Sequence, residues 1–290
     1  MRMSRKNDIV LFVIMVSFWA LNYPLVKFAL NYVDSFTLLF YRILMSLVGI
    51  LIIFNRKLRF NIRRNEIIPL FILSMLNVFI FMELWFIAET TISSSLSAIL
   101  IYTYPVISTL LSIIFLKESY NRYVILGIIL GFSGVIVIFF HGLISGLGIG
   151  VLIAFLGSVS WASGTIYYKK YLGGTERETT NFYQFAFAIV PALMVAGVFQ
   201  PNITLFEPNL TFLIIVIIIG FPGTAIAYYA FLHLNREYRV STISSFLFLV
   251  PALSVIFSIF LLNEIPSVYE IAGLLLVSIG IIFSAKGINK

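Results

Sequence analysis

The chain of 290 residues contains no cysteine, only two histidines and few charged side chains. Without cysteine there are no disulfides, no thiol nucleophile and no cysteine-based metal site. Charged residues make up 11% of the chain and hydrophobic residues 61%, whereas a soluble domain is about 25% charged and about 45–50% apolar. The composition therefore excludes an ordinary soluble domain.

What the chain does contain is a series of long hydrophobic stretches separated by short polar connections. A helix that crosses a bilayer needs about 20 apolar residues, and backbone exposed to lipid must satisfy its own hydrogen bonds. The expected fold is therefore all-α, a polytopic membrane protein with ten transmembrane helices and no separate soluble domain. The predicted spans are Ile9–Leu30, Phe36–Phe54, Ile67–Ala88, Leu96–Leu116, Tyr123–Phe140, Ile149–Tyr168, Asn181–Phe199, Leu210–Leu232, Val240–Leu262 and Val268–Ser284.

Two sets of residues recur at a constant spacing, which indicates an internal repeat. At an offset of 146 residues, the recurring positions are Pro105, Glu118, Gly127 and Gly134, matched by Pro251, Glu264, Gly273 and Gly280. At an offset of 142, they are Trp19, Lys27 and Phe40-Tyr41-Arg42, matched by Trp161, Lys169 and Phe182-Tyr183-Gln184. We therefore expect one five-helix repeat over residues 1–142 and a second over residues 143–290. Because five is odd, the second repeat is expected to be inverted in the membrane, as in alternating-access transporters.

Basic residues are confined to the two ends and to alternate connections. Of the 19 Lys and Arg residues, 17 lie there. They are Arg2, Arg5, Lys6, Arg56, Lys57, Arg59, Arg63, Arg64, Lys117, Arg122, Lys169, Lys170, Arg177, Arg236, Arg239, Lys286 and Lys290. By the positive-inside rule this side faces the cytoplasm. We predict a multi-pass protein of the cell membrane with both termini cytoplasmic, and we attribute the net charge of +7 to topology and not to nucleic-acid binding.

These features together resemble the drug/metabolite transporter superfamily, and within it the ten-helix EamA-type transporters. The resemblance is carried by the Trp-Ala pair and later Lys of each half, and by the Gly127–Gly134 and Gly273–Gly280 helices. It is also carried by the proline of spans four and nine with the terminal Leu116-Lys117-Glu118 and Leu262-Asn263-Glu264. It covers essentially the whole chain. It implies secondary transport of small metabolites, often export, around a central cavity between the halves, and it implies no particular substrate.

The two basic residues outside the connections are Lys27 and Arg42, and the one acid well inside a predicted span is Glu83. Such a residue costs about 2.5–3.5 kcal/mol on insertion scales, so it indicates function by default. All three fall in the outer part of their spans, in a layer roughly 5–10 Å below the external boundary at about 1.5 Å per residue. We predict an external cluster that gates the mouth, with Glu83 partly neutralising the cations. The alternatives are a structural ion pair and, for Lys27, snorkelling to the interface.

Polar and aromatic residues near the middle of the spans are the candidates for substrate binding. They are Trp19, Asn22, Tyr102, Tyr104, Trp161, Tyr228 and Tyr229. Pro24, Pro105 and Pro251 each remove a backbone donor, so we expect helix kinks there, with freed carbonyls that either face the cavity or pack against neighbouring helices.

We predict a secondary active transporter that exports small metabolites such as amino acids by alternating access. No ATP-binding motif is present, so a gradient must supply the energy. One alternative is an exporter of drugs or lipophilic cations, in which Glu83 would be the only embedded acid available for proton exchange. A second is an exchanger of phosphorylated sugars or nucleotide-sugars, although phosphate recognition usually uses clustered Lys and Arg.

Other functional classes fit the sequence poorly. An intramembrane protease needs paired Asp, Ser with His, or a zinc set, and the predicted spans contain no Asp and only His233 near an end. A channel would contain a repeated filter motif, which is not visible. We therefore expect no enzyme activity, no cofactor and no metal. The expected partners are a small-molecule substrate and the lipid bilayer. The substrate, the direction, the coupling ion and the oligomeric state stay open, and a monomer is compatible with the sequence.

Overall fold

A computed structural model of the protein describes residues 6–60, 62–199, 209–240, 243, 246–247 and 249–288. These residues form helices and connections, and no β-strand occurs among them. Eight helical stretches in this part of the chain are long and apolar enough to cross a membrane, and two shorter apolar helices, Leu249–Leu262 and Val268–Phe283, bring the number to ten. The predicted all-α, ten-helix membrane fold is confirmed.

The first half of the chain contains five spans. Its elements are α1 (Lys6–Ala29), α2 (Ser35–Phe54), the short η1 (Asn55–Lys57), α3 (Arg64–Ser74), η2 (Met75–Ile80), α4 (Phe81–Thr91), α5 (Ser94–Ile101), α6 (Tyr104–Phe115) and α7 (Arg122–Ile144). The third span combines α3, η2 and α4, and the fourth combines α5 and α6. Polar caps begin these helices: Asp34 accepts hydrogen bonds from the amides of Phe36 and Thr37 at the start of α2, which satisfies donors that have no partner within the helix.

The second half repeats this plan. Its elements are α8 (Gly148–Tyr167), η3 (Tyr168–Leu172), α9 (Arg177–Phe199), α10 (Leu210–Gly220), η4 (Phe221–Ile226), α11 (Ala227–Glu237), α13 (Leu249–Leu262) and α14 (Val268–Ile288). The predicted ninth span, Val240–Leu262, lies partly outside the described residues.

The span boundaries differ from the predictions in two places that affect the chemistry. Helix α1 begins at Lys6, so Asp8 belongs to it and is buried. The expectation that the spans contain no Asp is therefore wrong. The third span continues to Thr91, beyond the predicted end at Ala88, so Glu89 lies inside the bundle and is completely buried. In both cases the helix includes an acidic residue beyond the predicted end of the span, and that acid has a hydrogen-bond partner within the protein.

Three spans that the hydrophobic pattern predicts as uninterrupted contain an irregular segment. The third and eighth spans contain the π-helical segments η2 and η4, which begin 146 residues apart at Met75 and Phe221. The fourth span is broken at Tyr102 and Thr103, and Pro105 is the second residue of the helix that follows. A π segment changes the face that the following turn presents to the core, and such segments are frequent at functional sites.

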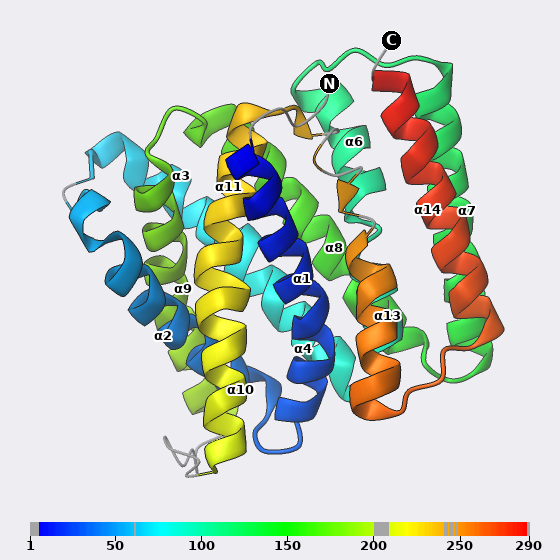
Figure 1. The fold of residues 1–290 in the computed structure, drawn as a ribbon, viewed down its shortest axis with the longest axis horizontal. Helices are drawn as coiled ribbons and strands as arrows, with labels where there is room; N and C mark the ends of the chain where they lie inside the picture. The colour runs from blue at the N-terminus through cyan, green and yellow to red at the C-terminus, as the bar shows by residue number, and fades with distance from the viewer. Residues whose placement is uncertain are drawn as a thin grey trace.

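The two halves are arranged as inverted copies. Successive spans run in alternating directions, so α1 and α8, five spans apart, point opposite ways, and α1 begins at the same end of the bundle at which α14 ends (Figure 1). Local backbone geometry is copied as well, because Lys117 and Asn263, 146 residues apart, both have φ of 54° at the end of a span.

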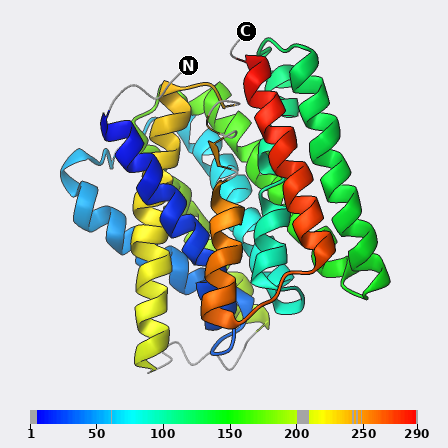
Figure 2. The same ribbon diagram turned by 45° about the vertical axis from the view of Figure 1, so that its right-hand side comes forward.

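The last helices of the two halves, α7 and α14, lie side by side at one edge of the bundle (Figures 1 and 2). They approach closely at glycines: a side chain added at Gly134 would lie 2.8 Å from the carbonyl oxygen of Gly273. The other spans enclose an aromatic core that includes Trp19, Trp85 and Trp161. The candidate site lies within that core.

Candidate substrate-binding site

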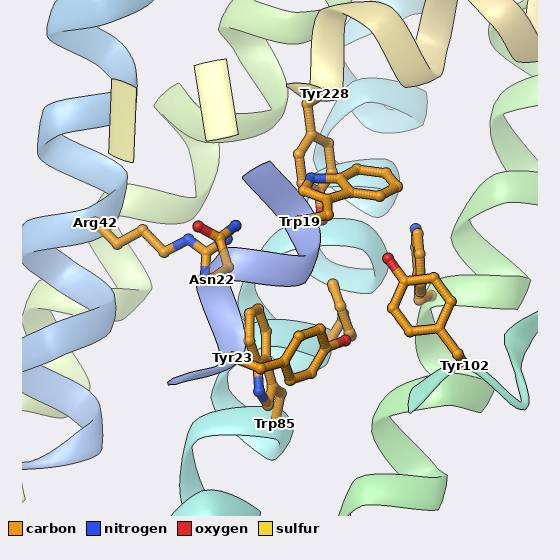
Figure 3. A pocket seen from close by; sticks show the side chains of 9 residues that line it. Trp19, Asn22, Tyr23, Arg42, Trp85, Tyr102 and Tyr228 are labelled. Atoms are coloured by element: carbon orange, nitrogen blue, oxygen red, sulfur yellow. The ribbon is translucent and has the colours of Figure 1, made fainter. Parts of the chain in front are cut away.

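A buried pocket lies where both halves of the chain meet. Its lining side chains come from α1, α2, α4, α8 and α11 and from the break after α5. They are Trp19, Asn22, Tyr23, Arg42, Phe81, Trp85, Tyr102, Trp161 and Tyr228 (Figure 3). Each of these residues is at most 5% exposed, so the pocket is closed to both sides of the membrane.

The space inside the pocket is small. The cavity volume open to the centre of a water molecule is about 10 Å³, which is close to the space needed for a single water. Pockets that hold small ligands are typically about 300–1,000 Å³. The pocket as it stands is therefore too small for an organic substrate, which could enter only if the surrounding helices moved apart.

Arg42 is the charged side chain of this pocket. It extends from α2 toward Asn22 (Figure 3), and its Nε donates to Thr224 Oγ1 at 2.9 Å. Its guanidinium carbon lies 4.8 Å from the centre of the Trp85 ring and 5.5 Å from that of Phe86. The Nη1 group is buried without a hydrogen-bond partner. Among the described residues no carboxylate forms an ion pair with Arg42, so a buried cation keeps an unused donor.

Asn22 and Trp161 add two further unpaired polar atoms. Asn22 donates from Nδ2 to the carbonyl oxygen of Gly223 at 2.9 Å, while its Oδ1 is buried without a partner. The indole Nε1 of Trp161 is also buried and unpaired. Buried polar atoms are usually hydrogen-bonded, so each exception needs an explanation. The pocket thus offers two donors and one acceptor that a bound molecule could use.

The π-helical segments position these groups. In η4 the carbonyl of Gly223 meets Asn22 and the hydroxyl of Thr224 meets Arg42. Gly223 is required by this close approach, since a side chain added there would clash with the Asn22 amide and lie 3.0 Å from the Ile218 carbonyl oxygen. In η2 the carbonyl of Asn77 accepts from the Tyr228 hydroxyl at 3.0 Å.

Aromatic rings form the rest of the wall. Trp161 lies nearly parallel to Phe81, with centroids 5.1 Å apart, and Trp19 packs edge-on against Trp161 at 5.3 Å. Tyr104 stacks on Trp161 at 4.0 Å without lining the pocket. Such packed rings present apolar faces together with a few polar tips, which suits a ligand that is partly apolar.

Of the seven predicted substrate-binding residues, Trp19, Asn22, Tyr102, Trp161 and Tyr228 line the pocket. Tyr104 supports Trp161 from behind. Tyr229 lies elsewhere: its ring packs against Phe54 at 4.6 Å and its hydroxyl donates to Glu178 at 3.4 Å. Tyr228 and Tyr229 are neighbours on one helix, so they face different directions, and only one of them can point to the centre.

The predicted external cluster of Lys27, Arg42 and Glu83 is not formed. Arg42 lines the central pocket instead. Lys27 donates to the backbone carbonyls of Glu89 and Ile92 at the end of the third span. Among the described residues no ion pair or hydrogen bond joins Glu83 to either cation, and its neighbours are Asp34 and Ser35. Their positions along the predicted spans suggested one layer, but the three side chains have different neighbours in the structure.

The three predicted kink positions differ in their surroundings. Pro105 follows the break between α5 and α6. Pro24 lies inside the unbroken α1, and Pro251 lies in the first turn of α13.

Four residues at or behind the pocket wall were not predicted: Tyr23, Phe81, Trp85 and Glu89. Tyr23 adjoins Asn22 in sequence, and Phe81 and Trp85 are four residues apart on one face of a helix, which is a detectable signal. Glu89 follows by another four residues and accepts a hydrogen bond from Trp85 Nε1 at 2.5 Å. Glu89 was not predicted because the predicted third span ends at Ala88, one residue before it.

Polar contacts join the two halves at both ends of the bundle. At the end where α1 begins, Asp8 accepts from Tyr238 at 2.6 Å and pairs with His233 at 2.9 Å. At the opposite end, the carboxylate of Glu264 accepts hydrogen bonds from the amides and hydroxyls of Ser94 and Ser95 at 2.9–3.1 Å. Polar contacts between the halves are therefore present at both ends of the bundle in the same structure.

A ten-helix membrane bundle of two inverted halves, closed around a buried pocket that both halves line, defines the class of multi-pass membrane transporters. The chain belongs to the EamA-like transporter family, whose profile matches residues 7–140 and again residues 148–285.

Known relatives agree with this assignment. The chain is 29% identical to the uncharacterized transporter YvbV of Bacillus subtilis, over 95% of this chain and 90% of that protein. It is 25% identical to the uncharacterized transporter YdfC of the same organism, over 96% and 90% of the two chains. A solved crystal structure superposes with a TM-score of 0.72 at 16% identity over 98% of both chains, a likeness that concerns the fold alone.

Proposed function

We propose that the protein is a secondary transporter of small amphipathic metabolites that carry a carboxylate, amino acids among them. The observation that supports this most is Arg42, a buried guanidinium with an unpaired donor in an aromatic pocket. Guanidinium groups bind carboxylates through charge-assisted and often bidentate hydrogen bonds. The unpaired oxygen of Asn22 would accept from an ammonium group of the same molecule.

In this proposal the aromatic rings hold the apolar part of the substrate. Transport proceeds by alternating access: the contacts of Asp8 and those of Glu264 open in turn while the pocket moves from one side to the other. The distribution of basic residues supports cytoplasmic termini in the cell membrane. Net export is the direction that the family resemblance favours. Release of the accumulated metabolite from cells that overproduce the protein would test the direction.

The substrate class can be tested with three matched probes. Proteoliposomes containing the purified protein are loaded with radiolabelled L-phenylalanine, 3-phenylpropionate or 2-phenylethylamine, and exchange against unlabelled compound is followed. These probes share the aromatic ring and differ in the carboxylate and the ammonium. We expect exchange of the two carboxylates and none of the amine. Exchange of the amine alone would contradict the proposal and favour a transporter of lipophilic cations.

Arg42 should determine this selectivity. R42Q removes the charge that would bind the carboxylate, and we expect it to reduce carboxylate exchange at least tenfold, or about 1.4 kcal/mol in binding. Glutamine is chosen because the residue at the equivalent position of the second half is the neutral Gln184. R42K retains the charge without the planar fork and should be intermediate. Equal exchange by all three proteins would contradict a role for Arg42 in binding. Thermal unfolding of each variant controls for loss of the fold.

A further inference from the structure

Glu89 lies directly behind the wall of the pocket and has no role in the binding just described. It is 0% exposed. Trp85 donates from Nε1 to Glu89 Oε1 at 2.5 Å, and Oε2 has no hydrogen-bond partner. The same indole packs against Tyr23 at 4.5 Å and lies beneath the Arg42 guanidinium. Trp85 therefore contacts both the cation of the pocket and the buried acid.

The second half of the chain indicates that this scaffold position does not need an acid. At the offset of 146 residues, Trp85 and Glu89 correspond to Phe231 and Asn235. Asn235 donates from Nδ2 to the carbonyl of Phe231 at 3.0 Å, and its Oδ1 is buried without a hydrogen-bond partner, so a neutral amide stands where the first half has a carboxyl group. Lys169 binds the backbone carbonyl of Asn235 just as Lys27 binds that of Glu89. Both halves therefore have the contact between a lysine and this backbone carbonyl, but only the first half has a carboxyl group at the position, that of Glu89.

The charged and titratable groups around Glu89 do not neutralise it directly. Lys27 and Tyr23 face it from α1, Arg42 from α2, and Glu264 from the segment between α13 and α14. None of the cations forms an ion pair with it among the described residues. The hydroxyl of Ser97 on α5 is its other polar neighbour and is itself unpaired. A buried carboxylate without a paired cation is costly, and a proton bound at Oε2 would remove the charge and supply a donor toward Ser97.

We propose that Glu89 is a proton-binding site and that the proton and a substrate carboxylate bind together. The proposal rests on the function proposed above. Without substrate, the ionised Glu89, which is hydrogen-bonded to the ring that the Arg42 guanidinium covers, balances the charge of Arg42. When a substrate carboxylate occupies Arg42, that guanidinium no longer balances Glu89, and a proton taken from solution onto Glu89 removes the carboxylate charge that has lost its counter-ion. On release the carboxylate leaves Arg42 and Glu89 returns the proton to the same side. Substrate and proton move in the same direction, and a metabolite that has accumulated inside drives its own exit.

The test uses proteoliposomes that contain L-phenylalanine transport activity and a pH-sensitive dye in the lumen, with the membrane potential clamped. For wild type we expect accumulation of L-phenylalanine when the outside is acidic, up to about tenfold per pH unit for one proton per substrate, and alkalinisation of the lumen during efflux. E89Q should keep exchange at equal pH and lose both pH effects. The variant E89N, which introduces the residue found at the equivalent position of the second half, Asn235, should also lose both pH effects.

E83Q is the matched control, because Glu83 is a buried acid six residues earlier in the same helix with no hydrogen bond in the described residues. It should retain both pH effects. Full proton coupling in E89Q, or its loss in E83Q alone, would overturn the proposal.

A measurement that needs no substrate separates this proposal from the proposed function. Infrared difference spectra of the purified protein between high and low pH should contain a protonated-carboxyl band that E89Q lacks and E83Q retains. If the wild-type protein exchanges no L-phenylalanine, the proposed function fails. The infrared spectra would still show whether Glu89 binds a proton. A spectrum that E89Q leaves unchanged would overturn the proton site whatever the substrate.

Discussion

At the scale of single residues, Lys27 and Lys169 are the clearest pair of copies. Lys27 binds the backbone carbonyls of Glu89 and Ile92, and Lys169 binds those of Asn235, Arg236 and Tyr238. In each half the lysine of the first span therefore caps the end of the third span of the same half, where a helix leaves carbonyls without partners. A contact within one half does not need to break when the halves move, so anchoring explains these lysines better than gating.

Substituting Lys27 should therefore reduce stability more than it changes transport. K27M removes two hydrogen bonds from a charged donor, and we expect a loss of about 1.5–3 kcal/mol in the free energy of unfolding. Thermal unfolding followed by tryptophan fluorescence would measure it, with K169M expected to cost at least as much. K170M is the control, because Lys170 is exposed and lies over aromatic rings. Unchanged stability of K27M with an altered transport rate would instead support a gate.

Arg42 and Glu89 differ from the lysines because their counterparts, Gln184 and Asn235, are uncharged. The sequence alone identifies Arg42 as an embedded cation, but it cannot tell which way the side chain points. From its position in the outer part of the predicted span, we predicted that Arg42 lies at the external mouth. The hydroxyl of Thr224 and the ring of Trp85 turn it into the pocket, and both partners belong to elements remote in the chain.

At the scale of elements, the π-helical segments η2 and η4 are the features that shape the pocket. Each lies in the third span of its half and contacts the first helix of the other half. In one contact, Gly223 of η4 meets Asn22 of α1. In the other, Asn77 of η2 meets Gly164 of α8. An asparagine faces a glycine at both crossings, with the two residue types exchanged. Hydrophobic periodicity does not detect an extra residue in one turn, since most residues of the two segments and of the helices around them are apolar.

Gly223 should be sensitive to the smallest addition. G223A places a methyl group against the Asn22 amide and the Ile218 carbonyl, and overpacking of this kind costs about 1–3 kcal/mol. We expect a lower midpoint of thermal unfolding and weaker substrate exchange, because Asn22 must move. G197A is the matched control, since no atom lies within 4 Å of the added group and alanine favours a helix by up to about 1 kcal/mol. Equal behaviour of the two variants would show that the crossing tolerates rearrangement.

At the scale of the whole molecule, polar contacts join the two halves at both ends of the bundle, on either side of the buried pocket. In the proposed alternating-access cycle, this arrangement would be one state. The end formed by Ser94, Ser95 and Glu264 joins α5 of the first half to the segment after α13 of the second. Nearby, the hydroxyls of Ser94 and Ser258 are 2.7 Å apart. In alternating access these contacts between halves must separate once per cycle.

The absence of cysteine makes this directly testable. Replacing Ser94 and Ser258 with cysteine introduces two thiols at positions whose side-chain oxygens are 2.7 Å apart, close enough for a disulfide. Oxidation of S94C/S258C should abolish exchange of L-phenylalanine, and reduction should restore it. The single variants, which cannot form the bond, should be unaffected by oxidant. Continued exchange by the oxidised double variant would show that this end of the bundle stays closed during transport.

The sequence by itself determined the class, the number of spans and their inverted repeat, because these follow from hydrophobic length, charge placement and constant offsets, which are properties of the linear chain. It also identified most of the aromatic pocket, since large polar-tipped rings near the middle of a span have few other places to lie. Only the tertiary structure decided the contacts of Lys27, Arg42, Glu83 and Glu89. The partner of a buried charge is chosen by the face of its helix and by packing against helices of the other half. A π segment or a span extended by one turn changes that face without leaving a trace in the hydrophobic pattern.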